Sequence, residues 1–253
     1  MIDLSATIRN AGFTIAVMCL AALMPTGPAY AEASLEISPT RIVLTERAPV
    51  TGVNIRNRGD EKVVVQLQLL SWSQDNGEEH YSLANDAGLA ICPSVITLQP
   101  GEVQIVRIGL ESPDIDWSEE RPYRLIIQEV PPPPVNTGRN VQIAVRISVP
   151  VFLQPAVMVQ PTLKWDLEKR DGNGLWMTVR NDGNAHALIG GVRLEDSDQF
   201  AYDVSTHKYV LPGATISWRL DKNQPLDGAL PKRVNATIST DQGVYQETLK
   251  IKK

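Results

Sequence analysis

Three histidines are the first residues in this chain whose side chains could transfer protons or bind metal. His80, His186 and His207 lie far apart, and none has a partner at metal-ligand spacing. A solvated or structural role is therefore expected for each. The acidic run at residues 195–198 (EDSD) is similar to a small cation site. A calcium loop needs more ligands at defined spacing, so we expect a solvated loop there and no metal.

Motifs for covalent or phosphoryl chemistry are also missing from the sequence. It contains no Gly-x-Ser-x-Gly elbow and no Gly-x-x-x-x-Gly-Lys phosphate loop. A triad assembled from distant positions remains open in principle. No residue can be named as a catalyst, so we predict a protein that is not an enzyme and needs no cofactor.

The longest alternating run, residues 141–153 (VQIAVRISVPVFL), is the main functional clue. Val141, Ile143, Val145 and Ile147 point to one side if the segment is a regular strand. One interpretation is a half-buried strand that lines its own core. The other is an edge strand that offers alternate apolar side chains to another protein.

The length of the run and its setting favour the edge strand. It exceeds the typical strand of about 5–6 residues, and it follows a proline-rich segment, residues 131–140, that cannot add a regular hydrogen-bonded strand. A bare apolar edge would aggregate. It therefore needs a shield, either self-association as a capping dimer or the proline-rich loop itself.

Composition excludes one class of partner. The 253 residues include 29 acids and 24 Lys and Arg, for a net charge of −5. A nucleic-acid surface needs clustered positive charge, so we expect no nucleic-acid partner. The 43% of hydrophobic and 21% of charged residues are typical of a folded globular chain.

The N-terminal segment has the pattern of a cleaved secretory signal. Residues 13–24 are apolar, residues 25–28 (PTGP) break the run, and small residues Ala29 and Ala31 follow. The run is shorter than the roughly 20 residues that span a bilayer. We predict a signal peptide over residues 1–31, export to the periplasm and no membrane insertion. Cleavage leaves Cys92 as the single thiol, expected to be a small buried hydrophobe.

The rest of the chain predicts an all-β fold without a helix of ordinary length. Short alternating segments separated by turns indicate two immunoglobulin-like β-sandwiches, over residues 32–155 and 156–253. A short linker with proline at its ends, near residues 154–161, joins them. The predicted strands are residues 35–37, 42–44, 53–55, 63–72, 95–98, 103–110, 123–130 and 141–153, then 163–167, 175–180, 187–194, 209–211, 215–220, 234–239 and 244–251.

Several of these segments, in this order, resemble one family. The sequence is similar to the PapD-like periplasmic pilus-assembly chaperones of the chaperone–usher pathway over essentially the whole mature chain. The segments that carry the resemblance are ISPTRIVL at 37–44, LQPG at 98–101, YRL at 123–125, EVPP at 129–132, VQIAV at 141–145 and NDGNAH at 181–186.

The resemblance implies a mechanism and partners. In this family a pilin-like subunit lacks its last strand, and the chaperone lends one of its own before an outer-membrane usher receives the subunit. Val141, Ile143, Val145 and Ile147 would be the donated side chains. A basic cleft holds the subunit's C-terminal carboxylate, and Arg41 matches its first-strand arginine. Without the resemblance, Arg41 would be interpreted as a surface arginine.

The sequence departs from the main branch of the family at the second anchor. Pro150 stands where that branch has a lysine, and Gln154 where it has an arginine. The pattern is more similar to the archaic or alternative, spore-coat-like branch. Arg124 is the candidate second anchor, with an ion pair to Glu129 as the alternative. Arg146 is a further candidate.

A different exported two-sandwich protein, a carbohydrate-binding or adhesive module, is the main alternative function. Such a module exposes aromatic platforms to sugars. Aromatic residues make up only 6% of this chain, and most of its five tryptophans lie in strand-like runs typical of cores. A secreted hydrolase is a third reading.

Overall fold

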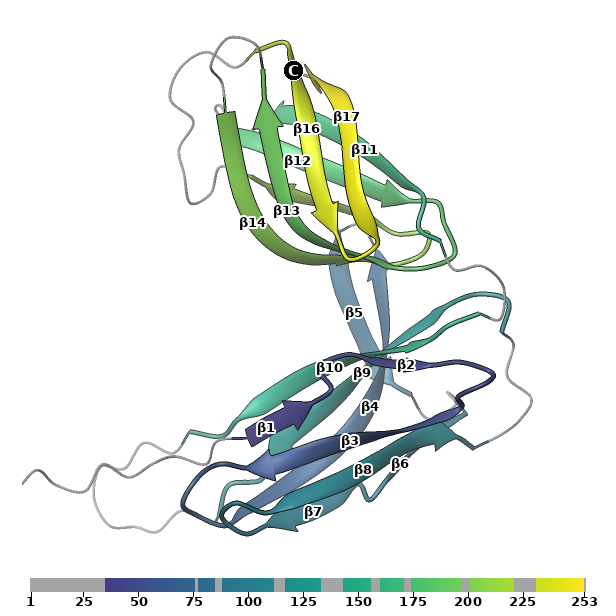
Figure 1. Cartoon of the computed structure of the whole chain (residues 1–253), viewed down its shortest axis with the longest axis vertical. Coiled ribbons are helices and arrows are strands. Elements are labelled where there is room, and N and C mark those ends of the chain that lie inside the picture. The colour runs from purple at the N-terminus through teal and green to yellow at the C-terminus, as the bar shows by residue number, and fades with distance from the viewer. Residues whose placement is uncertain are drawn as a thin grey trace, which may run out of the picture. The chain divides into compact units, whose positions relative to one another are not determined.

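The computed structural model describes residues 35–75, 77–84, 88–111, 117–132, 143–155, 160–170, 174–196, 201–220 and 231–252. Within these ranges the regular structure is all β, as predicted (Figure 1). No helix there is long and apolar enough to cross a membrane. The predicted signal peptide, Val141 and linker residues 156–159 lie outside the described residues.

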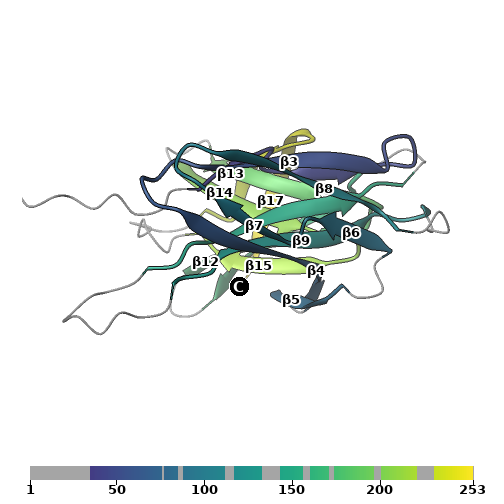
Figure 2. The same cartoon turned by 90° about the horizontal axis from the view of Figure 1, so that it is seen from below.

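The N-terminal sandwich is built from β1 to β10, in two sheets. Figures 1 and 2 show β3 and β8 side by side in the first sheet. That sheet has the order β1 (Leu35–Ser38), β3 (Val50–Asn57), β8 (Val103–Leu110), β6 (Leu89–Cys92). The second has the order β2 (Ile42–Leu44), β10 (Arg146–Leu153), β9 (Arg121–Glu129), β4 (Val63–Asp75), β5 (Glu78–Leu83), with β7 (Val95–Leu98) also paired to β4.

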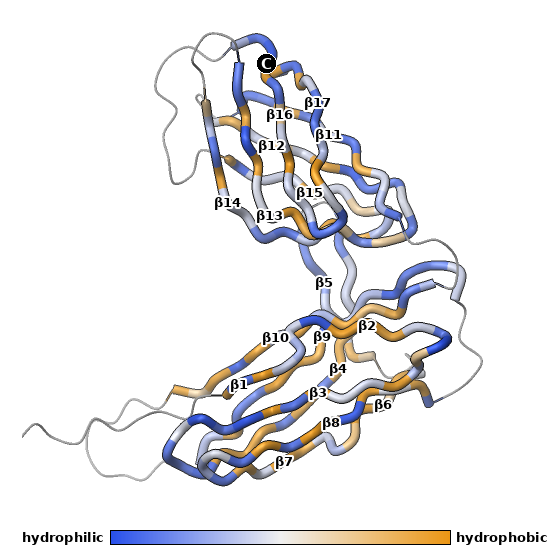
Figure 3. Tube along the Cα trace, viewed as in Figure 1, coloured by the Kyte–Doolittle hydropathy of each residue, from blue (hydrophilic) through white to orange (hydrophobic). Residues whose placement is uncertain are grey.

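The two sheets enclose one apolar core. Hydrophobic and hydrophilic residues are interleaved along the strands (Figure 3), so that every second side chain faces inward. Ile55 of β3, Ile108 of β8 and Leu125 of β9 are fully buried in this core. The core therefore holds β9 and the C-terminal half of β10, the strands that carry the site described below.

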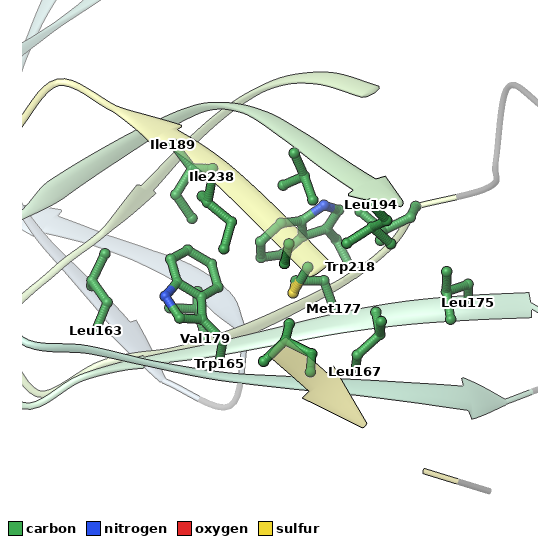
Figure 4. Packing of buried hydrophobic residues seen from close by; sticks show 14 of the residues in the cluster. Leu163, Trp165, Leu167, Leu175, Met177, Val179, Ile189, Leu194, Trp218 and Ile238 are labelled. Carbon is green, nitrogen blue, oxygen red and sulfur yellow. The ribbon is translucent and has the colours of Figure 1, made fainter. Parts of the chain in front are cut away.

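The C-terminal sandwich has its own core. Its strands follow the order β14 (Ala201–Val210), β13 (Ala187–Glu195), β16 (Arg233–Thr240), β17 (Gly243–Lys252), β11 (Leu163–Arg170), β12 (Gly174–Asn181), β15 (Thr215–Arg219). Figure 4 shows Trp165, Met177 and Trp218 packed together with the aliphatic residues around them. A small third cluster joins the two sandwiches: Trp72, Phe152, Leu211 and Ala214.

Each sandwich contains a fully buried asparagine that closes a turn. The Asn57 amide donates to the Glu61 carbonyl at 2.6 Å and the Leu98 carbonyl at 3.3 Å, and its Oδ1 accepts from the Gly59 N–H at 2.9 Å. A buried amide requires such partners. The Gly101 N–H, from a residue with φ of 78°, donates to the Asn57 carbonyl.

Asn181 repeats this arrangement in the C-terminal sandwich. Its amide donates to the Ala185 carbonyl at 2.6 Å and the Val210 carbonyl at 3.1 Å, and its Oδ1 accepts from the Gly183 N–H at 3.0 Å. The Gly213 N–H, with φ of 73°, donates to the Asn181 carbonyl.

Gly183 lies against the chain that enters the C-terminal sandwich. A Cβ at this position would stand 2.3 Å from the Gln160 carbonyl oxygen and 2.5 Å from the Thr162 nitrogen. Only glycine fits there without a backbone shift. The NDGNAH segment therefore fixes the start of the second sandwich.

The structure corrects three expectations. Strands β5 and β6 were not predicted. Strand β14 starts at Ala201, whereas the sequence predicted residues 209–211. Cys92 is exposed, so the expectation of a buried thiol is wrong: it ends β6 with its side chain turned away from the core.

Candidate functional site

Strand β10 is paired along its whole length on one side and only in part on the other. It pairs with β9 from Arg146 to Leu153. On its other side, β2 pairs in parallel with the last three residues, Val151 to Leu153. Among the described residues, no strand pairs with the second edge of residues 146–150. Half of β10 is thus an open edge with unpaired backbone groups.

The inward-pointing side chains of this segment emerge gradually from the core. Val149 and Val151 are 3% and 0% exposed. Ile147 and Val145 are half-buried, and Ile143 is 60% exposed. The alternating pattern predicted that these residues share a side. The structure places the buried ones in the sandwich and leaves an apolar row that continues beyond it.

The strand is shorter than predicted at its N-terminal end. The sequence predicted a strand over residues 141–153, whereas β10 begins at Arg146, so Ile143 and Val145 precede it. The last contact with β9 is at Glu129, whose N–H donates to the Val145 carbonyl at 2.9 Å. Residues 131 and 132 beyond it are prolines, which lack the N–H that would continue the ladder.

The opposite face of β10 borders a cavity of about 440 Å³. Both arginines predicted as anchors line it, from different elements. The lining residues are Thr40, Arg41, Glu79, Arg124, Ser148, Pro150, Leu188, His207 and Tyr209. Arg146 is not among them and is exposed at the start of β10.

Arg41 enters the cavity from the residue just before β2. Its Nη1 forms an ion pair with Oδ2 of Asp241, in the turn between β16 and β17. The Arg41 side chain is 40% exposed and that of Asp241 is 13% exposed. The guanidinium is thus held by a partner from the C-terminal sandwich while part of it stays accessible to a ligand.

Arg124 enters the cavity from the middle of β9, where it is the register partner of Pro150. Its Cζ lies 3.7 Å from the ring centroid of Trp72 and 5.4 Å from that of Tyr209. These cation–π contacts orient the guanidinium. The alternative ion pair to Glu129 is wrong, because an even and an odd residue of one strand project to opposite faces.

The cavity is suited to an anion. Burial raises the pKa of the Tyr209 phenol, while the positive charges of Arg41 and Arg124 act against that rise. Tyr209 is therefore neutral at pH 7, so it adds no negative charge. The one carboxylate in the lining, Glu79, accepts a hydrogen bond from Tyr81, whose pKa is raised to about 12 by burial and by this contact.

Sequence reasoning missed the groups that hold the two arginines. Asp241 lies 200 positions from Arg41, and Trp72 and Tyr209 had no feature beyond an aromatic side chain in a strand-like run. His207 lines the cavity and is exposed, whereas His186 is 2% exposed beside Glu120. No three His, Cys, Asp or Glu side chains in the described ranges gather as they would around a metal ion.

The N-terminal sandwich matches a known family. Residues 34–158 fit the model for pili and flagellar-assembly chaperones, PapD N-terminal domain. The N-terminal sandwich is therefore similar to the N-terminal domain of the PapD-like chaperones. The chain is 27% identical to the chaperone protein FanE of Escherichia coli over 129 residues, which are 51% of this chain and 53% of FanE. The chain thus spans about half the length of the curated relative it matches.

Solved structures support the fold of the chain as a whole. The chaperone–tip subunit complex CsuC–CsuE, from archaic chaperone–usher Csu pili of Acinetobacter baumannii, matches with a TM-score of 0.62 and 20% identity, over 87% of this chain and 99% of that one. The SafA pilin–SafB chaperone complex of Salmonella enterica matches at 0.58 and 14% identity, over 85% and 96%. The predicted two-domain immunoglobulin-like fold is confirmed.

Proposed function

We propose that this protein is a periplasmic chaperone that binds pilin-like subunits by lending them the open edge of β10 and delivers them to an outer-membrane usher. The observation that carries the proposal is the apolar row of Ile143, Val145 and Ile147 beside an unpaired backbone edge. An incomplete sandwich lacking one strand would gain main-chain hydrogen bonds from this edge and fill its groove with these side chains.

The energetics favour such a complex. Each apolar side chain that leaves water contributes about 1.5–3 kcal/mol before ordering costs. Val141, outside the described residues, would extend the row by one more side chain. No cofactor or ATP is required, because the folding of the subunit itself supplies the free energy.

The cavity would set the register of the complex. We assign Arg41 and Arg124 to the subunit's C-terminal carboxylate, since both line the space beside the open edge. Pro150 and Gln154 replace the basic residues of the main branch, which supports a place in the archaic branch. Export through cleavage after residue 31, and domain limits of 32–155 and 156–253, belong to the same proposal.

Co-expression in the periplasm with each pilin-like protein encoded nearby tests the function. We expect a one-to-one complex by native mass spectrometry, lost when the subunit's C-terminal residues are removed. Capture of no subunit by the folded chain would overturn the proposal in favour of a ligand-binding module.

The arginine assignment has a matched control. Arg41→Ala removes a charge-assisted hydrogen bond of about 1.5–3 kcal/mol, so affinity for the subunit should fall about 10- to 100-fold. Arg58→Ala, which removes an exposed ion pair with Glu36 in the same sandwich, should leave affinity unchanged. Equal affinities of the two variants would move the anchor elsewhere.

A further inference from the structure

Asp241 holds Arg41 and is itself held firmly. Its Oδ1 accepts a hydrogen bond from the Leu188 N–H at 2.8 Å, and its Oδ2 bonds the Arg41 guanidinium. If Arg41 turns toward a ligand carboxylate, Asp241 stays in place and loses its cation. A largely buried carboxylate without a cation is costly, so another group must compensate its charge.

His186 is the group placed to do so. Its ring is 2% exposed and stacks on Phe152 with centroids 3.6 Å apart. Its Nδ1 lies 2.8 and 2.9 Å from the two oxygens of Glu120, which also accepts the His186 backbone N–H at 2.9 Å. Its Nε2 is buried, has no hydrogen-bond partner and stands 3.8 Å from Oδ2 of Asp241.

The charges around the imidazole explain what a proton on Nε2 would do. The groups that face it are the Glu120 and Asp241 carboxylates, the Arg41 guanidinium beyond Asp241, and the neutral ring of Tyr209 at 5.6 Å. With Nδ1–H donating to Glu120, a bare Nε2 presents its lone pair toward an acid oxygen. A proton there creates an imidazolium between two carboxylates, replacing the charge that Arg41 withdraws.

We propose that Asp241 is a positioning residue for Arg41, and that binding of a carboxylate in the cavity is coupled to uptake of one proton from solvent at Nε2 of His186. This inference rests on the proposed carboxylate capture. Histidine is the side chain whose charge changes most readily between pH 5 and 8, which places the coupling in the range of the periplasm.

The inference can be tested without a ligand, because Arg41→Ala also removes the cation from Asp241. NMR titration of the imidazoles should show a higher His186 midpoint in Arg41→Ala than in the wild type. The His186 midpoint should return to its wild-type position in the double variant Arg41→Ala/Asp241→Asn, because that variant leaves no charge at position 241 to compensate. His80 and His207, both exposed, serve as internal references and should not move. An unchanged His186 midpoint in Arg41→Ala overturns the inference, whatever the chain captures.

Capture itself provides the second readout. Affinity for the subunit should rise as pH falls from 8 to 6, by up to about tenfold per pH unit, and His186→Gln should flatten the dependence. A flat profile in the wild type overturns the coupling but leaves the chaperone function standing. Absence of capture at every pH would instead contradict the proposed function, while the NMR shift would still be expected.

Discussion

The last strands of the two sandwiches differ in chemistry more than in geometry. In the N-terminal sandwich β10 is paired to β2 only at its final residues, and in the C-terminal sandwich β17 is paired in parallel to β11 only at Ile251 and Lys252. Among the described residues, the rest of each strand has a neighbour on one side alone.

The two strands differ in the row of side chains that points inward. Along β10 and the residues before it, the row consists entirely of Ile, Val and Leu. Along β17 the corresponding row is interrupted by exposed Glu247 between Tyr245 and Leu249. A charge on an edge discourages pairing with another chain. The proposed strand donation therefore needs more than an open edge; the continuous apolar row is the feature that β17 lacks.

The largest expected effect comes from placing charges on the apolar row. In Ile143→Asp/Val145→Asp, two side chains would enter the subunit groove charged, so capture should weaken about 100-fold or more. The matched control is Val244→Asp on β17, where the side chain is 63% exposed. Pull-down and calorimetry check the binding, and circular dichroism checks that both variants fold. Normal capture by the double variant would contradict the assignment of the donor strand.

The two buried asparagines test whether the sandwiches share one stabilising device. Asn57→Ala and Asn181→Ala each leave buried backbone groups without partners and should lower the free energy of unfolding by about 2–3 kcal/mol. Urea titrations measure both. If the loss of unfolding free energy in one sandwich is less than half of that in the other, the turn of the first sandwich is held by other contacts.

Restoring the row on β17 should produce a smaller effect. Glu247→Val makes the inward side of β17 continuous from Tyr245 to Ile251. We expect more self-association than in the wild type at equal concentration, by sedimentation velocity, and Glu247→Gln as a polar control should not show it. If neither variant self-associates more than the wild type, Glu247 is not what prevents this edge from pairing with another chain.

The smallest effect concerns ion pairs that tie each turn to the first strand of its sandwich. Lys164 and Arg180 lower the pKa of Asp182, and Arg58 lowers the pKa of Glu36. A carboxyl whose pKa is lower in the folded than in the unfolded chain stabilises the fold at pH values above its unfolded pKa of about 4. This stabilisation is lost as the pH falls through the folded-state pKa.

Asp182→Asn and Glu36→Gln should thus each lower Tm slightly at pH 7, and the differences from wild type should vanish near pH 2. Differential scanning calorimetry at the two pH values measures this. A persistent difference at low pH would mean that the side chains act through packing.

The sequence predicted some strands of the fold well and others poorly, for physical reasons that differ along the chain. Residues 103–110 predicted β8 to the residue because alternation there reports a half-buried surface. All six residues of β5 are exposed, so no apolar pattern marked it. The start of β10 depends on whether β9 can still donate hydrogen bonds opposite it, which no pattern within residues 141–153 encodes.

The site was predictable only where a residue stands close to a recognisable segment. Arg41 and Arg124 were identified because their segments resemble a family, and both line the cavity. The contact of Arg41 with Asp241 and that of His186 with Glu120 join residues 200 and 66 positions apart. Such pairs are set by how two sandwiches meet, and a single sequence carries no local signal of that.

The two faces of β10 allow its functions to diverge separately. Odd-numbered residues from Ile143 onward form the apolar row, while Ser148 and Pro150 border the cavity and Phe152 packs at the junction. In the proposed complex, a substitution at an even position would change the surroundings of the bound carboxylate and leave the apolar row unchanged. If the proposed function holds, such a strand could keep one groove-filling pattern over evolution while its preference for the client's chain terminus changes. Related systems on one genome would then avoid exchanging clients through a few changes at even positions.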